Sequence, residues 1–532
     1  MNEDNPKVSY LGITGGKIVK AGDQEKLPEL IRNCDRVVDL EGRTVLPGLT
    51  DAHMHLISYS NKKSNQVDLN EVNSMDELIN TVKEFINKKN IKPGEWVIGS
   101  GWNHERYADS ELPTRAHLDK ASTINPIMLF RTCYHIVAVN SKALEVAKID
   151  ENTTYSDDGK IDKDIHGVPT GIIRENAIEL IDDAIPMFED KETIKKLIVS
   201  GCNDLAEYGI TTVHTDDFSY ISNKKVLLEA YKELEYENKL PIRVVLQLRV
   251  HSKQDLYEYI DMGIKSYEGS DMLKYGPVKL IADGSLGSGT AALNEPYSDE
   301  QNNRGIFTFD ENVFEEIIFE AFKSDFDIAI HAIGDRTMEI ALTAFEKHKD
   351  LYKSKDFRPS IIHCQIANKD IIHRFSTNDI IANIQPIFIN YDWSIAEKRV
   401  GKKRLEYSYC WNKFTKNGIT CVASSDAPID TFNPMYGIYC AVTRKDLKGM
   451  PDKGWLEHEK LNVYEAIKLY TINSSVLSKD EEEKGCLKEG MYADFIVLSD
   501  NIEKITEDSI RDIKVIETYI NGEKLGKTLN NI

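Results

Sequence analysis

The sequence predicts an α/β protein: a (β/α)8, TIM-like barrel with a small composite β-sandwich domain built from both termini and a large insertion after the first barrel strand. Three observations lead to this fold class. Eight apolar, strand-like segments alternate with stretches of helical periodicity, and short strands with turn signals occur near both ends. Roughly 150 residues separate the first two barrel strands, far more than an ordinary βα connection. We therefore expect the sandwich at 1–48 and 485–532, the barrel at 49–484 and the inserted subdomain at 57–200.

The predicted barrel strands end in polar side chains. These strands are the segment before His53 and residues 209–214, 242–248, 277–281, 327–331, 359–363, 380–385 and 418–424. A barrel of this class carries its active site at the carboxyl ends of its strands. The polar residues at those ends are His53, His55, His214, His331, His363 and Asp426. Unrelated core histidines would rarely coincide with strand ends in this way, so a catalytic site is the preferred interpretation.

Both ends of the chain contain short strands with turn signals. Near the start, residues 10–14 and 17–19 flank Gly15-Gly16 as a hairpin, and residues 36–40 and 43–46 are predicted to form a second hairpin around Glu41-Gly42. Near the end, residues 493–498 and 515–520 are predicted strands. One small β domain made from both ends is the preferred interpretation, and two hairpins that each pack locally are the alternative.

The inserted region has helices and polar-aromatic clusters of its own. Ser74, followed by Glu77, predicts the capped start of a helix. Trp102 and Tyr107 lie among charged residues, and a pocket role and an ordinary packing role carry equal weight for both. We expect this region to roof the barrel mouth and to control which substrate enters.

The composition is that of an acidic globular protein. Hydrophobic residues make up 41%, charged residues make up 29%, and the formal net charge is −21. Neither nucleic acid nor an anionic membrane is therefore an expected partner. The first residues lack the apolar core of a signal peptide, no apolar run is long enough to span a bilayer, and the eight cysteines form no C-x-x-C pair. We expect a cytoplasmic protein with reduced thiols and a small-molecule substrate, and we leave a homodimer open.

Residues 46–55 read Leu-Pro-Gly-Leu-Thr-Asp-Ala-His-Met-His, and the pair His53 and His55 is the most informative feature of the chain. In an extended segment, residues two apart point to the same side. Both imidazoles, next to Asp51, can therefore bind one metal ion, because histidine and carboxylate are the usual ligands of hydrolytic zinc. Taken alone, the pair is about equally compatible with two polar residues in a strand-end loop.

Other segments strengthen the first interpretation. The informative segments are 45–56, 101–106, 113–115, 140–144, 169–175, 278–288, 331–335, 362–363 and 424–428. Together they resemble the metal-dependent amidohydrolase superfamily over nearly the whole chain, and in particular the large-insertion branch that includes the N-substituted formamide deformylases. Two departures stand out: Gly289 occupies a position where many relatives have an arginine, and Asn103-His104 replaces a more usual acidic-polar pair. The resemblance therefore does not transfer the identity of the substrate.

The resemblance implies a role for each strand-end residue. His53 and His55 would hold one divalent metal, with Asp426 as a further ligand, and His331 and His363 would hold a second. Zinc is the expected metal. Lys279 occupies the position of a lysine whose carbamate bridges the two ions in two-metal relatives. The alternative is an unmodified Lys279 that pairs with Asp283 beside a single ion.

These roles predict a hydrolase that cleaves a non-peptide, amide-type C–N bond of a small molecule. A metal-activated hydroxide would attack the carbonyl, and Asp426 would move the proton of the attacking water to the leaving nitrogen. His214 and His135 are candidate catalytic residues for substrate contact or oxyanion support, with a structural role equally weighted for each.

Three alternatives remain open at this point. A mononuclear deaminase-type enzyme usually has a glutamate just after the fifth-strand histidine motif, where this chain has Ile333-Gly334-Asp335. The others are an esterase on the same barrel and a catalytically idle binding or regulatory protein.

Overall fold

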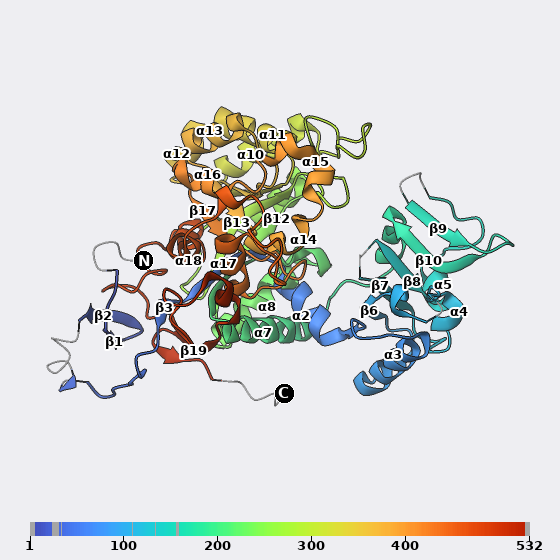
Figure 1. Ribbon diagram of the computed structural model, residues 1–532, viewed down its shortest axis with the longest axis horizontal. Helices are drawn as coiled ribbons and strands as arrows, with labels where there is room; N and C mark the ends of the chain where they lie inside the picture. Colours follow the sequence, from blue (N-terminus) through green and yellow to red (C-terminus); the bar gives the residue numbers. More distant parts are fainter. Residues whose placement is uncertain are drawn as a thin grey trace. The chain divides into compact units, whose positions relative to one another are not determined.

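The computed structural model describes residues 6–23, 31–32, 34–108, 110–132, 135–155 and 159–526, and the chain divides into two compact units. One unit consists of Met1–Tyr59 and Glu189–Ile532, and the other is Ser60–Phe188. Both are drawn in Figure 1.

The first unit is built on eight parallel strands that form a nearly closed barrel. In spatial order they are β4 (Leu49–Met54), β11 (Ile210–Thr215), β12 (Arg243–Arg249), β13 (Leu273–Ile281), β14 (Ile328–Ala332), β15 (Ser360–His363), β16 (Ile381–Ile384) and β17 (Cys421–Ala423). Nearly every strand residue is buried, as expected of parallel strands covered on both faces. The predicted barrel is therefore confirmed. β13 begins four residues earlier than predicted, because Leu273 and Lys274 already pair with Val244 and Val245 of β12.

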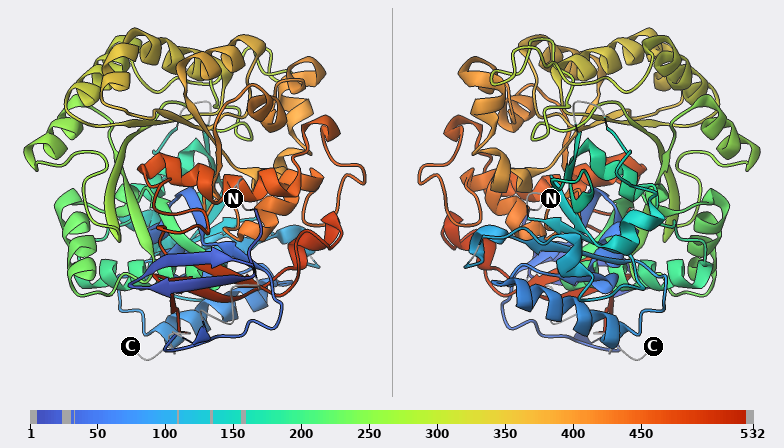
Figure 2. Two further views of the ribbon diagram at one scale, coloured as in Figure 1. Left: turned by 90° about the vertical axis from the view of Figure 1, so that its left-hand side faces the viewer. Right: turned by 90° about the vertical axis from the view of Figure 1, so that its right-hand side faces the viewer.

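Helices surround these strands. The longer ones are α7 (Lys191–Glu207), α8 (Lys224–Tyr236), α9 (Lys253–Asp261), α10 (Glu311–Lys323), α11 (Asp335–Lys347), α13 (Lys369–Asn378), α15 (Ala396–Leu405) and α17 (Pro434–Thr443). Shorter ones are α12 (Lys349–Ser354), α14 (Ile389–Asp392), α16 (Trp411–Lys416), α18 (Val463–Leu469) and α19 (Ile472–Ser475). Helix α2 (Leu56–Asn65) follows β4 and continues past the boundary between the two units. Figure 2 shows the green to orange helices as an outer ring around the strands. The strand ends inside this ring carry the candidate site.

The first and last barrel strands are joined beside that site. The backbone N–H of Asp426 donates to the carbonyl of His53 at 2.9 Å, and the N–H of His55 donates to Ala427 at 2.8 Å. The Asp51 carboxylate accepts from the backbone N–H of Ser425 at 3.0 Å and from its hydroxyl at 2.5 Å. Asp51 therefore helps to join the first and last barrel strands, although the sequence prediction put it beside a metal.

Both ends of the chain contribute to one small β structure, as the fold class predicts. β3 (Val45–Pro47) pairs with β18 (Phe495–Leu498), and β19 (Val515–Ile520) and β20 (Glu523–Lys524) complete an antiparallel sheet. β1 (Tyr10–Thr14) and β2 (Lys17–Gly22) form the predicted hairpin. The second predicted hairpin is wrong, because residues 36–40 form no strand and β3 takes its partner from the C-terminal end instead.

A buried ion pair joins this small sheet to the barrel, and it leads to a stability prediction. Arg243, 2% exposed at the start of β12, donates from Nε to Asp494 Oδ2 at 2.7 Å and from Nη2 to Oδ1 at 3.0 Å.

Asp494→Ala leaves the guanidinium buried with fewer partners, so we expect the free energy of unfolding to fall by about 3–5 kcal/mol. Urea titration measures this change. Asp508→Ala removes the more exposed pair with Lys445 and is the control, with an expected cost of about 0–1 kcal/mol; equal costs for both variants would contradict the prediction.

The second unit, Ser60–Phe188, contains a six-stranded mixed sheet. Its strands, in spatial order, are β5 (Gln66–Asp68), β6 (Val97–Trp102), β7 (Ile127–Arg131), β8 (Ile136–Val139), β10 (Pro169–Glu175) and β9 (Gly159–Lys163). Its helices are α3 (Met75–Lys89), α4 (Arg115–Leu118), α5 (Ser141–Val146) and α6 (Glu179–Asp182). Ser74 caps α3 by accepting from the N–H of Glu77, as predicted. The placement of this unit over the barrel mouth stays a prediction.

Trp102 and Tyr107 are core residues of the second unit. They are 0% and 3% exposed, and both belong to its main apolar cluster. Trp102 Nε1 donates to the carbonyl of Leu129 at 2.7 Å. The packing interpretation is therefore correct for both residues, and a pocket-lining role is not.

The cysteines and the helices agree with two further expectations. Cys202, Cys364, Cys410, Cys421, Cys440 and Cys486 are buried thiols without disulfide partners, whereas Cys133 lies outside the described residues. Within the described part of the chain, no helix is both long and apolar enough to cross a bilayer.

Candidate metal centre

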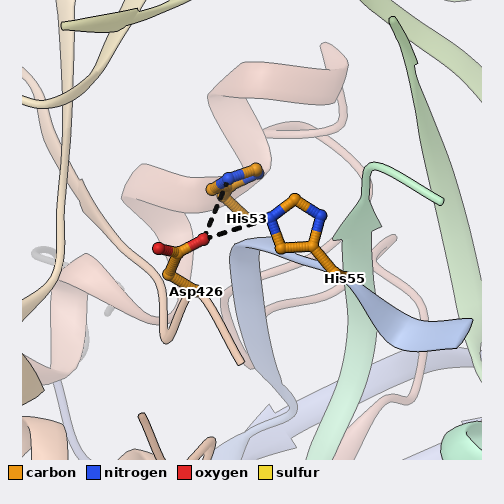
Figure 3. Close-up of side chains that lie close together, drawn as sticks. All are labelled: His53, His55 and Asp426. Carbon is orange, nitrogen blue, oxygen red and sulfur yellow. Dashed lines mark ion pairs between the residues drawn. The ribbon is translucent and has the colours of Figure 1, made fainter. Parts of the chain in front are cut away.

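His53, His55 and Asp426 converge at the joined edge of the barrel. Asp426 Oδ1 lies 3.3 Å from His53 Nε2 and 3.4 Å from His55 Nε2 (Figure 3). One ligand atom from each residue lies within 4.8 Å of the others, which is a spacing that one metal ion can bridge. The other oxygen of Asp426 points away from both rings in Figure 3. His53 lies in β4, His55 directly follows that strand, and Asp426 lies in the segment after β17, so the junction of the first and last barrel strands brings them together.

Hydrogen bonds fix the ring orientation of both histidines. His53 Nδ1 lies 2.6 Å from Gln247 Oε1, and His55 Nδ1 lies 2.7 Å from the backbone oxygen of Asp216. The backbone oxygen of Asp216 can only accept. Gln247 Oε1 is also an acceptor, because the amide nitrogen of Gln247 donates to the Ala52 carbonyl. In the neutral rings each Nδ1 therefore carries the hydrogen, and each Nε2 keeps its lone pair for a metal ion beside Asp426.

His331 and His363 lie beside this trio. Their ring centroids are 4.3 Å apart, and the ring of His363 is 6.1 Å from that of His53. His363 Nδ1 lies 2.8 Å from Gln385 Oε1, which leaves Nε2 for a metal, whereas His331 Nε2 faces the Gly284 carbonyl at 3.0 Å, which leaves Nδ1. The backbone of His363 has φ 85°, a strained value for a residue with a Cβ and one found mostly at functional sites.

Lys279 reaches the same cluster from β13. Its Nζ lies 3.4 Å from His53 Nε2, and the residue is 1% exposed. Burial lowers the pKa of this ammonium to about 7. Asp283, the alternative partner, instead accepts from the backbone N–H groups of Ala292, Ile333 and Gly334 at 2.9–3.1 Å. The lysine is thus placed beside the histidines with a substantial neutral fraction near neutral pH.

Burial and neighbouring groups set protonation states at this site that suit a bound cation. Burial lowers the pKa of His53 to about 4 and that of His363 well below its usual range, so both rings are neutral. Burial would raise the pKa of Asp426, but the close contacts with the His53 and His55 rings hold it well below the ordinary value. One anion beside the neutral imidazoles of His53 and His363 is a fitting donor set for a divalent metal.

The two remaining catalytic candidates are His214 and His135. His214 is buried on β11, and its Nε2 has no hydrogen-bond partner among the described residues. Burial, followed by the charge of Lys484, lowers the pKa of His214 to about 3. His135 belongs to the second unit, where its Nδ1 lies 2.8 Å from Glu175 Oε2. Their roles in substrate contact stay predictions.

The sequence interpretation missed the residues that support the ligands. Gln247 and Gln385 accept from His53 and His363, and Asp216 provides the carbonyl for His55. The sequence shows only a glutamine within each of two strand-like runs, Val-Val-Leu-Gln-Leu and Ile-Ala-Asn-Ile-Gln, and this pattern carries no signal specific to a supporting role.

A model of a known protein family matches almost the whole chain. The model described as "Amidohydrolase family" matches residues 36–525. The chain belongs to the amidohydrolase family. This amidohydrolase is 32% identical to YtcJ of Bacillus subtilis over 98% of its own length and 97% of YtcJ. It is 25% identical to the N-substituted formamide deformylase of Arthrobacter pascens over 96% of its own length and 93% of that enzyme. The resemblance expected from the sequence is confirmed.

Solved structures agree with this assignment. A metal-dependent hydrolase from Pyrococcus horikoshii is 28% identical, with a TM-score of 0.76 and coverage of 94% of this chain and 95% of the other. Its counterpart from Pyrococcus furiosus is 29% identical, with the same TM-score and coverage of 93% and 95%. The amidohydrolase thus shares its architecture, including the insertion, with hydrolases described as metal-dependent.

Proposed function

We propose that this amidohydrolase is a metal-dependent hydrolase that cleaves an amide-type, non-peptide C–N bond of a small molecule. The observation that carries the proposal is the convergence of His53 Nε2 and His55 Nε2 on Asp426 Oδ1 at 3.3 and 3.4 Å. The name of the Arthrobacter relative, which refers to an N-substituted formamide, supports an amide-type substrate.

The residues present fit a divalent metal, with zinc as the proposed ion. His53, His55 and Asp426 would hold one ion, and His331 and His363 would hold a second, bridged by Lys279 as its carbamate. The ion, when bound, lowers the pKa of water and polarises the carbonyl of the substrate. A neutral His53 imidazole and an Asp426 carboxylate that is ionised at rest are protonation states that suit this binding.

Asp426 is the residue that moves the proton. One of its oxygens lies between the two histidines, and the other points away from them, so one carboxylate can keep its place among the ligands and still accept a proton. We propose that it accepts the proton of the attacking water and delivers that proton to the nitrogen that leaves. The transfer leaves the carboxylate ionised again at the end of the reaction.

Metal removal tests this proposal. We expect the purified protein to contain one or two metal ions per chain and to hydrolyse members of a panel of N-formyl and N-acyl amines. Treatment with a chelator should abolish the activity, and added Zn²⁺ should restore it.

A parallel panel of esters and amino-substituted heterocycles separates the alternatives. Hydrolysis of esters alone, or release of ammonia from the heterocycles alone, would replace the proposed reaction. A metal content below about a tenth of an equivalent, after expression with added zinc, would overturn the role of the metal.

A further inference from the structure

A continuous chain of hydrogen bonds runs through the barrel interior between two of the candidate ligands. It starts at His53 and passes through Gln247, the Ala52 carbonyl, Asn383 and Ser424 to Gln385, which contacts His363. Every side chain in this chain is at most 3% exposed. We call the four side chains Gln247, Asn383, Ser424 and Gln385 the polar belt.

The distances of the belt are those of ordinary hydrogen bonds. Gln247 Nε2 donates to the Ala52 carbonyl at 3.3 Å, and Asn383 Nδ2 donates to the same oxygen at 3.0 Å. Ser424 Oγ donates to Asn383 Oδ1 at 2.6 Å, and Gln385 Nε2 donates to Ser424 Oγ at 2.8 Å. The belt therefore joins strands β12, β4 and β16 and the end of β17 across the interior.

The Ala52 carbonyl can only accept, and this fixes which atom donates and which accepts in every hydrogen bond of the belt. The Ala52 carbonyl takes amide N–H groups from both sides, so Gln247 must turn Oε1 toward His53, and Asn383 must turn Oδ1 toward Ser424. The Ser424 hydroxyl then donates to Asn383 and accepts from Gln385, which leaves Gln385 Oε1 for His363. Both histidines must therefore carry their hydrogen on Nδ1 and present Nε2.

We propose that the polar belt is a single positioning device that holds His53 and His363 in the metal-binding tautomer and couples the two halves of the centre. The proposal rests on the metal-dependent function proposed above. The belt uses neutral amides where a metal-bound histidine often has a carboxylate. Neutral partners orient the rings without adding charge next to the ionised Asp426.

A belt also explains why these buried polar groups remain in a barrel interior that apolar side chains usually fill. A buried amide costs free energy unless its donors and acceptors are paired. Each amide of the belt has a partner at its carbonyl and at its nitrogen, so the polar groups are compatible with a stable core. The loss of one member breaks the directional chain and leaves its neighbours free to rotate.

Metal affinity is the decisive measurement. Gln247→Met and Gln385→Met keep the approximate volume and remove the acceptors, and we expect each to weaken Zn²⁺ binding by roughly 10–100-fold, as measured by competition with a chromophoric chelator. Ser424→Ala touches neither histidine, yet the belt predicts a loss of roughly tenfold for it as well. Thr337→Val is the control, because this buried hydroxyl on α11 has no hydrogen-bond partner among the described residues.

The melting temperature of each chelator-treated variant separates positioning from stability. We expect weaker metal binding in Ser424→Ala with a metal-free melting temperature close to that of Thr337→Val. Wild-type affinity in Ser424→Ala, with losses confined to the glutamine variants, would show two separate contacts and overturn the belt. If a glutamine variant does not fold, Ser424→Ala, which removes one oxygen atom, still decides the question. A wild-type protein that binds no zinc would instead contradict the proposed function itself.

Discussion

Asp426→Asn is expected to lower kcat by roughly 10²–10⁴, the usual contribution of general acid–base catalysis, while much of the metal stays bound. Asparagine keeps the size of the side chain and one oxygen for the metal, but its amide cannot accept the proton of water near neutral pH. The carboxylate is suited to this role because its contacts with His53 and His55 keep it ionised. Metal content, melting temperature and kcat, measured on one preparation, check the prediction.

Asp392→Asn provides the matched control for this variant. Asp392 is also a buried carboxylate, but it accepts from Tyr409 and Gln365 and not from the metal-site histidines. We expect this variant to change stability more than turnover. Near-normal kcat in Asp426→Asn, with a lowered melting temperature, would refute the proton-transfer role and leave a structural one.

Lys279→Ala is expected to remove at least one metal ion per chain. Its activity should fall by at least roughly 10–100-fold, the usual effect of losing a residue that hydrogen-bonds to a metal ligand. Burial beside His53 lowers the pKa of this lysine to about 7, so much of it is neutral near neutral pH, and only a neutral amine can react with carbon dioxide. The resulting carbamate would supply two oxygens to two ions. Acetate or propionate should partly restore both metal and activity, because a short carboxylate can occupy the place of the carbamate.

Lys274→Met serves as the control for a lysine on the same strand. Lys274 pairs with Asp480 at the opposite end of β13, so its loss should affect stability and leave the metal content unchanged. Full metal content and full activity in Lys279→Ala would show that the lysine is not a bridging ligand. Loss of both without rescue by carboxylates would argue for a purely structural lysine.

The barrel could be predicted because its strands carry local signals. Parallel strands covered on both faces appear as continuous apolar runs, and the histidine pair at the end of β4 was visible in its two-residue spacing. The pairing of β3 was not predictable, because its partner β18 lies more than 400 residues away and a nearby turn signal suggested a hairpin. A turn signal in the sequence shows where the chain can reverse its direction. It does not show which strands pair, because that depends on segments far away in the chain.

The candidate ligands could also be predicted from local signals, whereas the residues that hydrogen-bond to them could not. His331 and His363 follow apolar strands, so their strand ends could be identified, whereas nothing local distinguishes the supporting role of Gln247 or Gln385 from that of any other polar residue in a strand. Trp102 stood among charged residues in the sequence, but burial in the second unit is a property of tertiary packing. Which partner a side chain meets depends on contacts between strands and cannot be derived from spacing along one strand.

Anomalous diffraction at the zinc edge, from crystals of zinc-loaded wild-type protein, tests the central claim most directly. We predict a peak about 2.0–2.1 Å from His53 Nε2 and His55 Nε2, with Asp426 among the ligands. A second peak beside His331 and His363, with density extending from Lys279, would establish the two-metal form. The absence of any peak at this position, with both histidines still turned to Asp426 alone, would contradict the metal centre and the function proposed from it.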